Sequence, residues 1–132
     1  MRLLLDTHVF LWSLLDTAKL SATARVALAD PANEIAVSAV SFWEVAIKSA
    51  LGKLSLQGVA ADDLPAEARK AGYIVTPLDA EVAASSHKLP ASIHRDPFDR
   101  MLAWQAICES CTLVSRDRAM AGFETRGLKL LW

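Results

Sequence analysis

The chain has 132 residues, of which 53% are hydrophobic, so it is long enough and apolar enough to form one domain with a substantial core, which excludes a disordered chain. Its formal net charge of −1 excludes the strongly basic proteins that coat nucleic acid without selectivity. No apolar run approaches the roughly 18 residues of a membrane helix, and the first run stops at Asp6, too early for a signal peptide, so we expect a single cytoplasmic domain over residues 1–132 with no membrane association.

Strand and helix patterns alternate along the chain. In chain order we expect a strand at Leu3–Leu5, helices at Val9–Leu15 and Leu20–Ala29, a strand at Glu34–Val37, helices from Ser38 to about Leu51 and at Asp62–Ala71, a strand at Tyr73–Thr76, helices at Leu78–Lys88 and Pro97–Ser110, a strand at Thr112–Ser115, a short helix around Arg118–Ala121 and a strand at Leu128–Leu131. Such alternation indicates βαβ units. It predicts an α/β fold in which helices cover both faces of a five-stranded, mostly parallel sheet.

Four acidic residues stand near the points where strands end or helices begin: Asp6, Glu44, Asp99 and Asp117. In a parallel sheet, ligands bind outside the carboxyl ends of the strands, and Asp6, Asp117 and the helix that carries Glu44 all follow strands there. Carboxylates that converge raise one another's pKa unless a cation neutralises them. The pattern therefore predicts a divalent metal site with oxygen ligands, suited to Mg²⁺ with Mn²⁺ as a substitute, that acts on phosphate esters.

All four acids also have a purely structural interpretation, which for Asp99 is the first turn of a helix, where an acid suits the dipole. Asp6 suits a turn after the first strand, and Asp117 suits the cap of a short helix. Glu44 and Lys48 are one helical turn apart and suit an ion pair on a solvated helix face. These alternatives stay open from the residues alone.

The densest charged segment is His94–Arg100. Asp96 followed by Pro97 is a typical helix start, and Asp99 in the first helical turn complements the helix dipole. We favour Asp99 as the metal ligand and leave Asp96 open as either a cap or a direct participant. None of the histidines has the spacing of metal ligands, so we expect His94 on a loop or at the surface.

Polar and basic residues complete the predicted site. Thr7, Ser38 and Ser41 are expected to orient carboxylates or waters. The residues expected to bind phosphates that flank the reacting group are Lys48, Lys53, Arg95, Arg100, Arg116 and Arg118. The four tryptophans are predicted to be core or interface aromatics: Trp12, Trp43, Trp104 and Trp132.

Four segments carry a resemblance to a known family. They are Leu4-Leu5-Asp6-Thr7-His8, Ser38-x-x-Ser41-x-x-Glu44-Val45, the run from His94 to Ala103 with Asp96-Pro97-Phe98-Asp99 inside it, and Leu113-Val114-Ser115-Arg116-Asp117. The chain resembles the PIN-domain family, and in particular the VapC-type toxin ribonucleases of bacterial VapBC toxin–antitoxin modules. The resemblance covers nearly the whole chain, with the motifs in the order of the family.

The resemblance implies a PIN-like, three-layer α/β/α sandwich. It implies an Mg²⁺- or Mn²⁺-dependent endoribonuclease that hydrolyses phosphodiester bonds in tRNA, rRNA or mRNA. The catalytic, metal-binding positions would be Asp6, Glu44, Asp99 and Asp117, with Asp96 matching an acid that is frequent in relatives with Asp-Pro-Phe-Asp. The resemblance also implies a homodimer and a cognate VapB-type antitoxin that wraps the toxin and blocks the acidic pocket.

Two other functions remain open from the residues. A phosphatase with Asp6 as its nucleophile is expected to carry Asp-x-Asp after the first strand, whereas His8 occupies the second of these positions. A non-catalytic docking module would use the acidic pocket to bind a basic segment of a partner and would show no metal-dependent turnover. Metal binding therefore separates the nuclease from the docking module.

Overall fold

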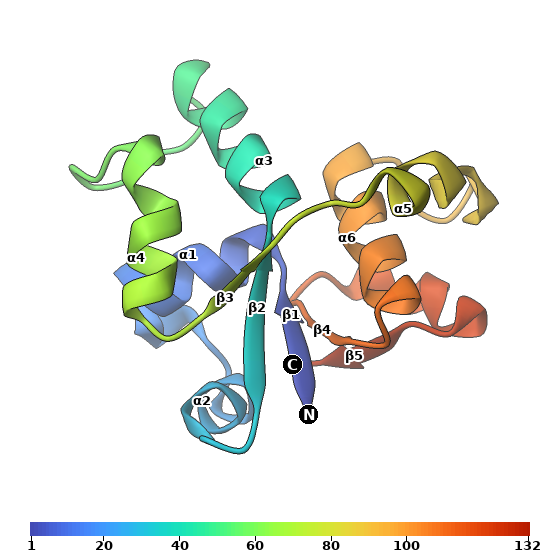
Figure 1. Ribbon diagram of the computed structural model, residues 1–132, viewed down its shortest axis with the longest axis horizontal. Coiled ribbons are helices and arrows are strands. Elements are labelled where there is room, and N and C mark those ends of the chain that lie inside the picture. The colour runs from blue at the N-terminus through green and yellow to red at the C-terminus, as the bar shows by residue number, and fades with distance from the viewer.

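A computed structural model describes residues 1–132 and has a five-stranded sheet at its centre (Figure 1). The strands are β1 (Arg2–Leu5), β2 (Glu34–Ser38), β3 (Ile74–Thr76), β4 (Thr112–Val114) and β5 (Lys129–Leu131). All neighbouring pairs are parallel, in the order β3-β2-β1-β4-β5. Each predicted strand is confirmed to within one residue at its ends, and the sheet is entirely parallel.

Helices connect these strands. They are α1 (Thr7–Leu15), α2 (Ala22–Ala29), α3 (Ala39–Ala50), α4 (Leu64–Lys70), α5 (Ala80–Ser85) and α6 (Pro97–Cys108), with 3₁₀ helices η1 (Thr17–Lys19), η2 (Ala61–Asp63), η3 (Ser86–Lys88) and η4 (Arg118–Arg126). The predicted helices are all present, but their ends differ where caps intervene. Leu20, for example, lies outside α2 because the Ser21 hydroxyl accepts the Ala24 N–H and starts the helix after it. No helix is both long and apolar enough to cross a membrane.

The sheet separates two cores, because alternate residues of a strand point to opposite faces. Leu3 and Leu5 of β1 and Val37 of β2 pack in the core that α1, α2 and α4 cover. Leu4, which lies between Leu3 and Leu5, and Ala36, which precedes Val37, pack in the opposite core, which α6 and η4 cover. Figure 1 shows α1, α2 and α4 on one side of the sheet and α5 and α6 on the other. The predicted three-layer α/β/α sandwich is confirmed.

The central strands end at the same level, which creates the edge where ligands are expected. Leu5 is paired with Val37 of β2 on one side and with Val114 of β4 on the other. The Asp6 N–H continues this ladder by donating to the Val114 carbonyl at 3.0 Å. The segments that follow β1, β2 and β4 therefore emerge side by side.

Candidate metal centre

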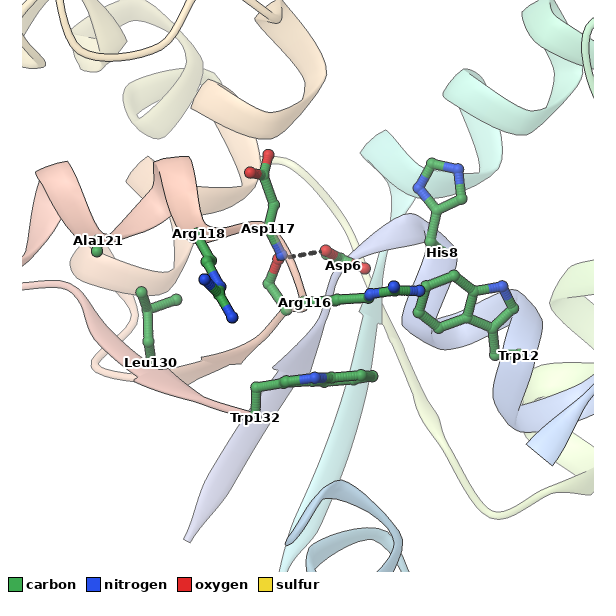
Figure 2. A pocket seen from close by; sticks show the side chains of 10 residues that line it. Asp6, His8, Trp12, Arg116, Asp117, Arg118, Ala121, Leu130 and Trp132 are labelled. Atoms are coloured by element: carbon green, nitrogen blue, oxygen red, sulfur yellow. Dashed lines mark hydrogen bonds between the residues drawn. The ribbon is translucent and has the colours of Figure 1, made fainter. Parts of the chain in front are cut away.

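Asp6 is held at the end of β1 by two hydrogen bonds. Its Oδ1 accepts from the Val9 N–H at 2.9 Å and so caps α1. Its Oδ2 accepts from the Ser115 hydroxyl at 2.5 Å, the bond drawn as a dashed line at Asp6 in Figure 2. Asp6 is buried, and burial raises its pKa against the opposing effect of these two hydrogen bonds. Asp6 is thus a helix cap and, at the same time, a carboxylate fixed at the predicted edge. Ser115, which follows β4, was given no role by the sequence.

Glu44 lies within α3 and is 2% exposed, which excludes the solvated surface pair with Lys48. Its Oε1 accepts from the Thr7 hydroxyl at 2.6 Å, and its Oε2 pairs with the Lys48 ammonium. The Thr7 hydroxyl also lies 3.0 Å from the Ser41 oxygen. Because Thr7 has a single hydroxyl proton and gives it to the carboxylate, Ser41 is the donor to Thr7. Thr7, Lys48 and, through Thr7, Ser41 fix the orientation of the Glu44 carboxylate.

The Lys48 ammonium stands among acids. Burial is the largest influence and acts to lower its pKa, but the hydrogen bond and charge of Glu44, with the charges of Asp96 and Asp99, outweigh it, so the pKa of Lys48 is raised. Lys48 therefore carries its positive charge at neutral pH. It is a counter-ion within the site that can also meet an incoming phosphate.

The most compact group of metal-ligating side chains consists of His94, Asp99 and Asp117, whose ligand atoms lie within 4.8 Å of one another. His94 Nε2 is 2.9 Å from Asp117 Oδ2 and 3.3 Å from Asp99 Oδ2. His94 Nδ1 accepts from the Asp96 N–H at 3.2 Å, which places the proton of a neutral imidazole on Nε2, facing the acids. In this arrangement His94 donates to the carboxylates, and the two aspartates supply the oxygen ligands.

His94 was expected on a loop or at the surface, and its position on a loop is confirmed. Its side chain is 13% exposed, and its ring stacks on Phe123 of η4 with the ring centroids 6.4 Å apart and the planes inclined by 8°. Spacing along the chain could not reveal this, because the fold brings His94 and Asp117 together across 23 residues.

Asp99 is the acid most affected by its neighbours. Its pKa is raised to about 7, first by burial and then by the charges of Asp96, Glu44 and Asp6, while His94 opposes the change. Asp6 and Glu44 thus act on Asp99 electrostatically although they lie outside the compact group. An acid whose pKa is raised by burial and by surrounding carboxylates marks a place where a divalent cation would be stabilised.

The pKa of Asp117 shifts in the opposite direction, to a lower value. Its partial burial acts to raise its pKa, but the hydrogen bonds from His94 and from the Ala119 N–H, together with the charge of His94, outweigh burial and lower the pKa. Asp117 also caps η4 through the Ala119 contact at 2.9 Å, so the predicted cap is confirmed. Asp117 stays ionised and available to a cation at the same edge as Asp99.

The raised pKa of Asp99 predicts a pH dependence of stability in the metal-free protein. Between the ordinary pKa of 3.8 and about 7, the folded chain holds a proton that the unfolded chain has released, so the free energy of unfolding falls as pH rises through this window. We expect a loss of about 1–2 kcal/mol after allowance for solvent screening. Urea unfolding at pH 5, 6, 7 and 8 in EDTA measures it; a stability that rises with pH over this range would contradict the prediction.

Asp96 begins α6 as a helix cap, as predicted. Its Oδ1 accepts from the N–H groups of Phe98 at 2.8 Å and Asp99 at 3.2 Å. This contact places Asp99 in the first turn of α6 and fixes the direction in which the helix leaves the site. Direct participation of Asp96 in chemistry stays a prediction.

Arg100 is committed to the chain itself. Its guanidinium donates to the carbonyls of Pro90 at 2.7 Å, Leu89 at 3.0 Å and His94 at 3.1 Å. With these donors engaged, the guanidinium is committed to the backbone, which counts against the prediction that Arg100 binds phosphate. Arg100 instead holds the loop that carries His94, and Gly122 lets η4 approach the same loop, because a Cβ there would lie 2.3 Å from Ile93 Cγ2.

Ser38 caps α3 and contacts no acid, so of its two predicted roles, orienting a carboxylate or a water, only the second stays a prediction. Its hydroxyl accepts from the Val40 N–H at 3.1 Å and donates to Gln105 Oε1 at 2.6 Å. Gln105 is fully buried and donates in turn to the Pro77 carbonyl at 3.0 Å. Sequence reasoning missed Gln105, because a glutamine in a helix is usually exposed.

The Ser38–Gln105 contact predicts a defect in folding and none in metal binding. Gln105→Leu leaves the Ser38 hydroxyl proton without an acceptor and the Pro77 carbonyl without its Gln105 donor, and we expect it to lower the free energy of unfolding by about 1–3 kcal/mol. The double variant with Ser38→Ala should lose less free energy of unfolding than the two single variants together, because the Ser38 hydroxyl and its Gln105 acceptor are then both removed. Urea unfolding with a parallel Mn²⁺ titration checks this; a weakened affinity for Mn²⁺ in the folded variant would show that Ser38 acts on the site.

The remaining basic residues of the prediction are exposed: Lys53, Arg95, Arg116 and Arg118. None of them has a carboxylate within the 4.0 Å of an ion pair. Their positive charges are therefore free for phosphate, in contrast to that of Arg100.

Comparison with known proteins places this geometry in context. The sequence model described as PIN domain matches residues 3–124. The chain is similar to Ribonuclease VapC22 of Mycobacterium tuberculosis (strain ATCC 25618 / H37Rv), with 36% identity over 125 residues, which cover 89% of this chain and 88% of that protein.

Solved structures with the same fold include two VapBC complexes. One is VapBC2 from Rickettsia felis, bound to a DNA fragment from the promoter of the VapBC2 pair. It matches with a TM-score of 0.66 and 16% identity over 98% of this chain and 97% of that chain. VapBC-1 from nontypeable Haemophilus influenzae matches with a TM-score of 0.66 and 18% identity over 98% of this chain and 96% of that chain. At identities this low the structural similarity shows only the fold. Family membership is shown by the sequence matches to the PIN domain model and to Ribonuclease VapC22.

Proposed function

This chain belongs to the PIN-domain family, and from that premise we propose that it is a divalent-metal-dependent endoribonuclease, the toxin of a VapBC-type toxin–antitoxin pair. One observation carries the proposal: at one edge of the sheet, burial and the charges of Asp96, Glu44 and Asp6 raise the pKa of Asp99 to about 7, and His94 lies against both Asp99 and Asp117 there. The relative named Ribonuclease VapC22 supports the ribonuclease activity.

The residues present fit a hard divalent cation. Asp6, Glu44, Asp99 and Asp117 offer carboxylate oxygens and no thiolate lies among them, a donor set that suits Mg²⁺ or Mn²⁺. We propose Mg²⁺, with Mn²⁺ as a substitute, held chiefly by Asp6 and Asp99 and assisted by Glu44 and Asp117. Such a cation stabilises charge on a phosphate and acidifies an attacking water.

The surrounding side chains position these carboxylates and the substrate. Ser115 and Thr7 each donate to one acid and so fix its orientation. Lys48, Arg95 and Arg116 are the basic residues that we propose for the phosphates on either side of the scissile bond. Because the substrate's charge is carried by its backbone, these contacts bind RNA without selecting its sequence.

The geometry favours the nuclease over the phosphatase. Both oxygens of Asp6 already accept a hydrogen bond, one from Val9 and one from Ser115. Such bonds stabilise the charge on a carboxylate and weaken it as a nucleophile. A search for a covalent phosphate on Asp6 after incubation with a phosphate ester is expected to find none.

We propose a VapB-type antitoxin as partner and a homodimer as the assembly. VapBC complexes among the structural neighbours support the partner. A basic segment of the antitoxin would complement the acidic edge.

Incubation with a mixed pool of tRNA and rRNA tests the proposed function. Purified, antitoxin-free protein is expected to yield discrete fragments with Mg²⁺ or Mn²⁺ and none in EDTA. A folded protein that cleaves nothing with either metal would leave the docking module as the better account. Fragments that persist in EDTA would contradict the metal dependence.

A further inference from the structure

His94 lies between two segments that each carry an acid of the metal centre. Its Nε2 is 2.9 Å from Asp117 Oδ2 and 3.3 Å from Asp99 Oδ2. Asp99 belongs to α6, whereas Asp117 precedes η4, so one ring nitrogen meets carboxylates from two separate elements. The site of four carboxylates described above gives His94 no function.

The tautomer of His94 decides whether its ring can bind a cation. Nδ1 accepts the Asp96 N–H at 3.2 Å, so the lone pair of Nδ1 is engaged and the proton of the neutral ring lies on Nε2. A ring nitrogen that carries a proton has no lone pair for a metal. His94 therefore offers the acids an N–H at the position where a histidine ligand would offer a lone pair to the cation.

The ring is held in this orientation from two sides. It stacks on Phe123 of η4, with the planes inclined by 8°. The His94 carbonyl accepts from the Arg100 guanidinium of α6 at 3.1 Å, and the same guanidinium lies 5.9 Å from the centroid of the Phe123 ring. Both elements that carry the acids thus also fix the ring, so the direction of the Nε2–H bond is set by the fold.

His94 is the side chain that orients Asp117. Arg116 and Arg118 flank this acid in sequence, but neither forms an ion pair with it. Figure 2 shows the Asp117 carboxylate pointing away from both guanidinium groups. Asp117 Oδ1 accepts the Ala119 N–H, and Oδ2 faces His94 Nε2. The backbone therefore holds one oxygen of Asp117, and His94 holds the other.

We propose that His94 is a positioning residue of the metal centre, which binds no cation itself and holds Asp117 beside Asp99 so that the two acids can share one. The proposal rests on the proposed metal-dependent ribonuclease function and adds a residue on which that site depends. Groups that hydrogen-bond a metal ligand fix its orientation, and their loss lowers metal affinity about 10–100-fold. Without the Nε2–H, the Asp117 side chain is free to turn toward the neighbouring arginines and away from Asp99.

Two substitutions separate the N–H of His94 from its ring. His94→Gln keeps an N–H donor at a similar distance from the backbone but loses the stacking on Phe123, whereas His94→Phe keeps a flat ring and loses the N–H. In calorimetric titrations with Mn²⁺ at pH 8, we expect His94→Phe to bind about 10–100-fold more weakly than the wild type and His94→Gln to keep most of the affinity. A role in packing alone predicts the opposite order. His87, exposed in η3 and paired with no acid, provides the control, and His87→Phe should leave the affinity unchanged.

The wild type supplies a measurement that does not depend on the folding of a variant. Nitrogen-15 NMR spectra of the metal-free protein at pH 8 should show the His94 proton on Nε2, and the proton should stay there when Mg²⁺ is added. A proton on Nδ1, or its loss from Nε2 on addition of Mg²⁺, would mean that the ring meets the cation as a ligand and would overturn the proposal.

The outcomes separate the role of His94 from the proposed function. Mn²⁺ affinity that is unchanged or increased in His94→Phe overturns the positioning role, while metal-dependent RNA cleavage by the wild type still stands. Affinity that is lost in His94→Phe and kept in His94→Gln supports the role even if the wild type cleaves no RNA, which would refute the nuclease alone. A wild type that binds no Mn²⁺ overturns both.

Discussion

Asp99→Asn is expected to lower metal-dependent RNA cleavage on the order of a thousandfold while the chain stays folded. The substitution removes a carboxylate from the group that holds the cation and keeps the volume of the side chain. It also removes the acid whose pKa is raised to about 7 by burial and by its acidic neighbours. In metal-free buffer the variant should therefore lose most of the fall in stability between pH 5 and 8, because no proton is released there.

An acid at the other end of the sheet provides the matched control for this variant. Asp30 is exposed and precedes β2, where its side chain only accepts from the Ala32 N–H. Asp30→Asn makes the same chemical change and should leave both cleavage and affinity for Mn²⁺ unchanged. Cleavage by the Asp99 variant at a tenth or more of the wild-type rate would remove Asp99 from the metal centre.

Arg100→Ala is expected to lower the free energy of unfolding by about 2–4 kcal/mol, because three carbonyls of the loop lose a charged donor. The loop carries His94, so the affinity for Mn²⁺ should fall as well. Arg95→Ala, at an exposed position in the same loop, should change stability by less than about 0.5 kcal/mol. It should instead weaken RNA binding and reduce its dependence on salt.

Urea unfolding and fluorescence titration with RNA at two salt concentrations separate these two arginines. If Arg100→Ala lost RNA affinity at undiminished stability, the phosphate-binding prediction for Arg100 would be reinstated. If Arg95→Ala were the destabilised variant, the assignment of the loop contacts would be wrong.

The fold could be predicted from the sequence because its strands are short, continuous apolar runs. A strand such as Leu3-Leu4-Leu5 is buried on both faces, with every side chain at 0% exposure, which is typical of a parallel sheet covered by helices. The alternation with helices then defined the architecture. The prediction was weaker for η4, where Met120 and Phe123 are buried three residues apart. That spacing matches three residues per turn, and Gly127 with a φ of 99° ends the helix.

The acidic edge could be predicted for the same reason, since the ends of parallel strands converge whatever the details of packing. Contacts between distant segments could not. The Ser115 hydroxyl reaches Asp6 across 109 residues of sequence, and Ser38 reaches Gln105 across 67. Ser115 and Gln105 are ordinary residue types in their own segments. Only packing makes Ser115 the hydrogen-bond partner of the Asp6 carboxylate and Gln105 the buried partner of Ser38 at the start of α3.

Arg100 shows a further limit of sequence reasoning. Within a segment of alternating charges, an arginine beside the acids suggests a phosphate ligand, and its exposed neighbour Arg95 suggests the same. Whether a guanidinium is free depends on which backbone carbonyls lie unpaired within its reach, and those belong to the loop formed by Leu89 and Pro90. Local pattern carries no information about them.

If the acidic edge is a divalent metal centre, its occupancy by the cation drives RNA cleavage. Parallel titrations with Mn²⁺, one of binding by calorimetry and one of the cleavage rate in the same buffer at pH 8, test it most directly. We predict that both curves reach half-saturation at the same Mn²⁺ concentration and that Asp99→Asn shifts both together. Cleavage that saturates where no Mn²⁺ binds, or a variant that binds Mn²⁺ as tightly as the wild type, would contradict the account.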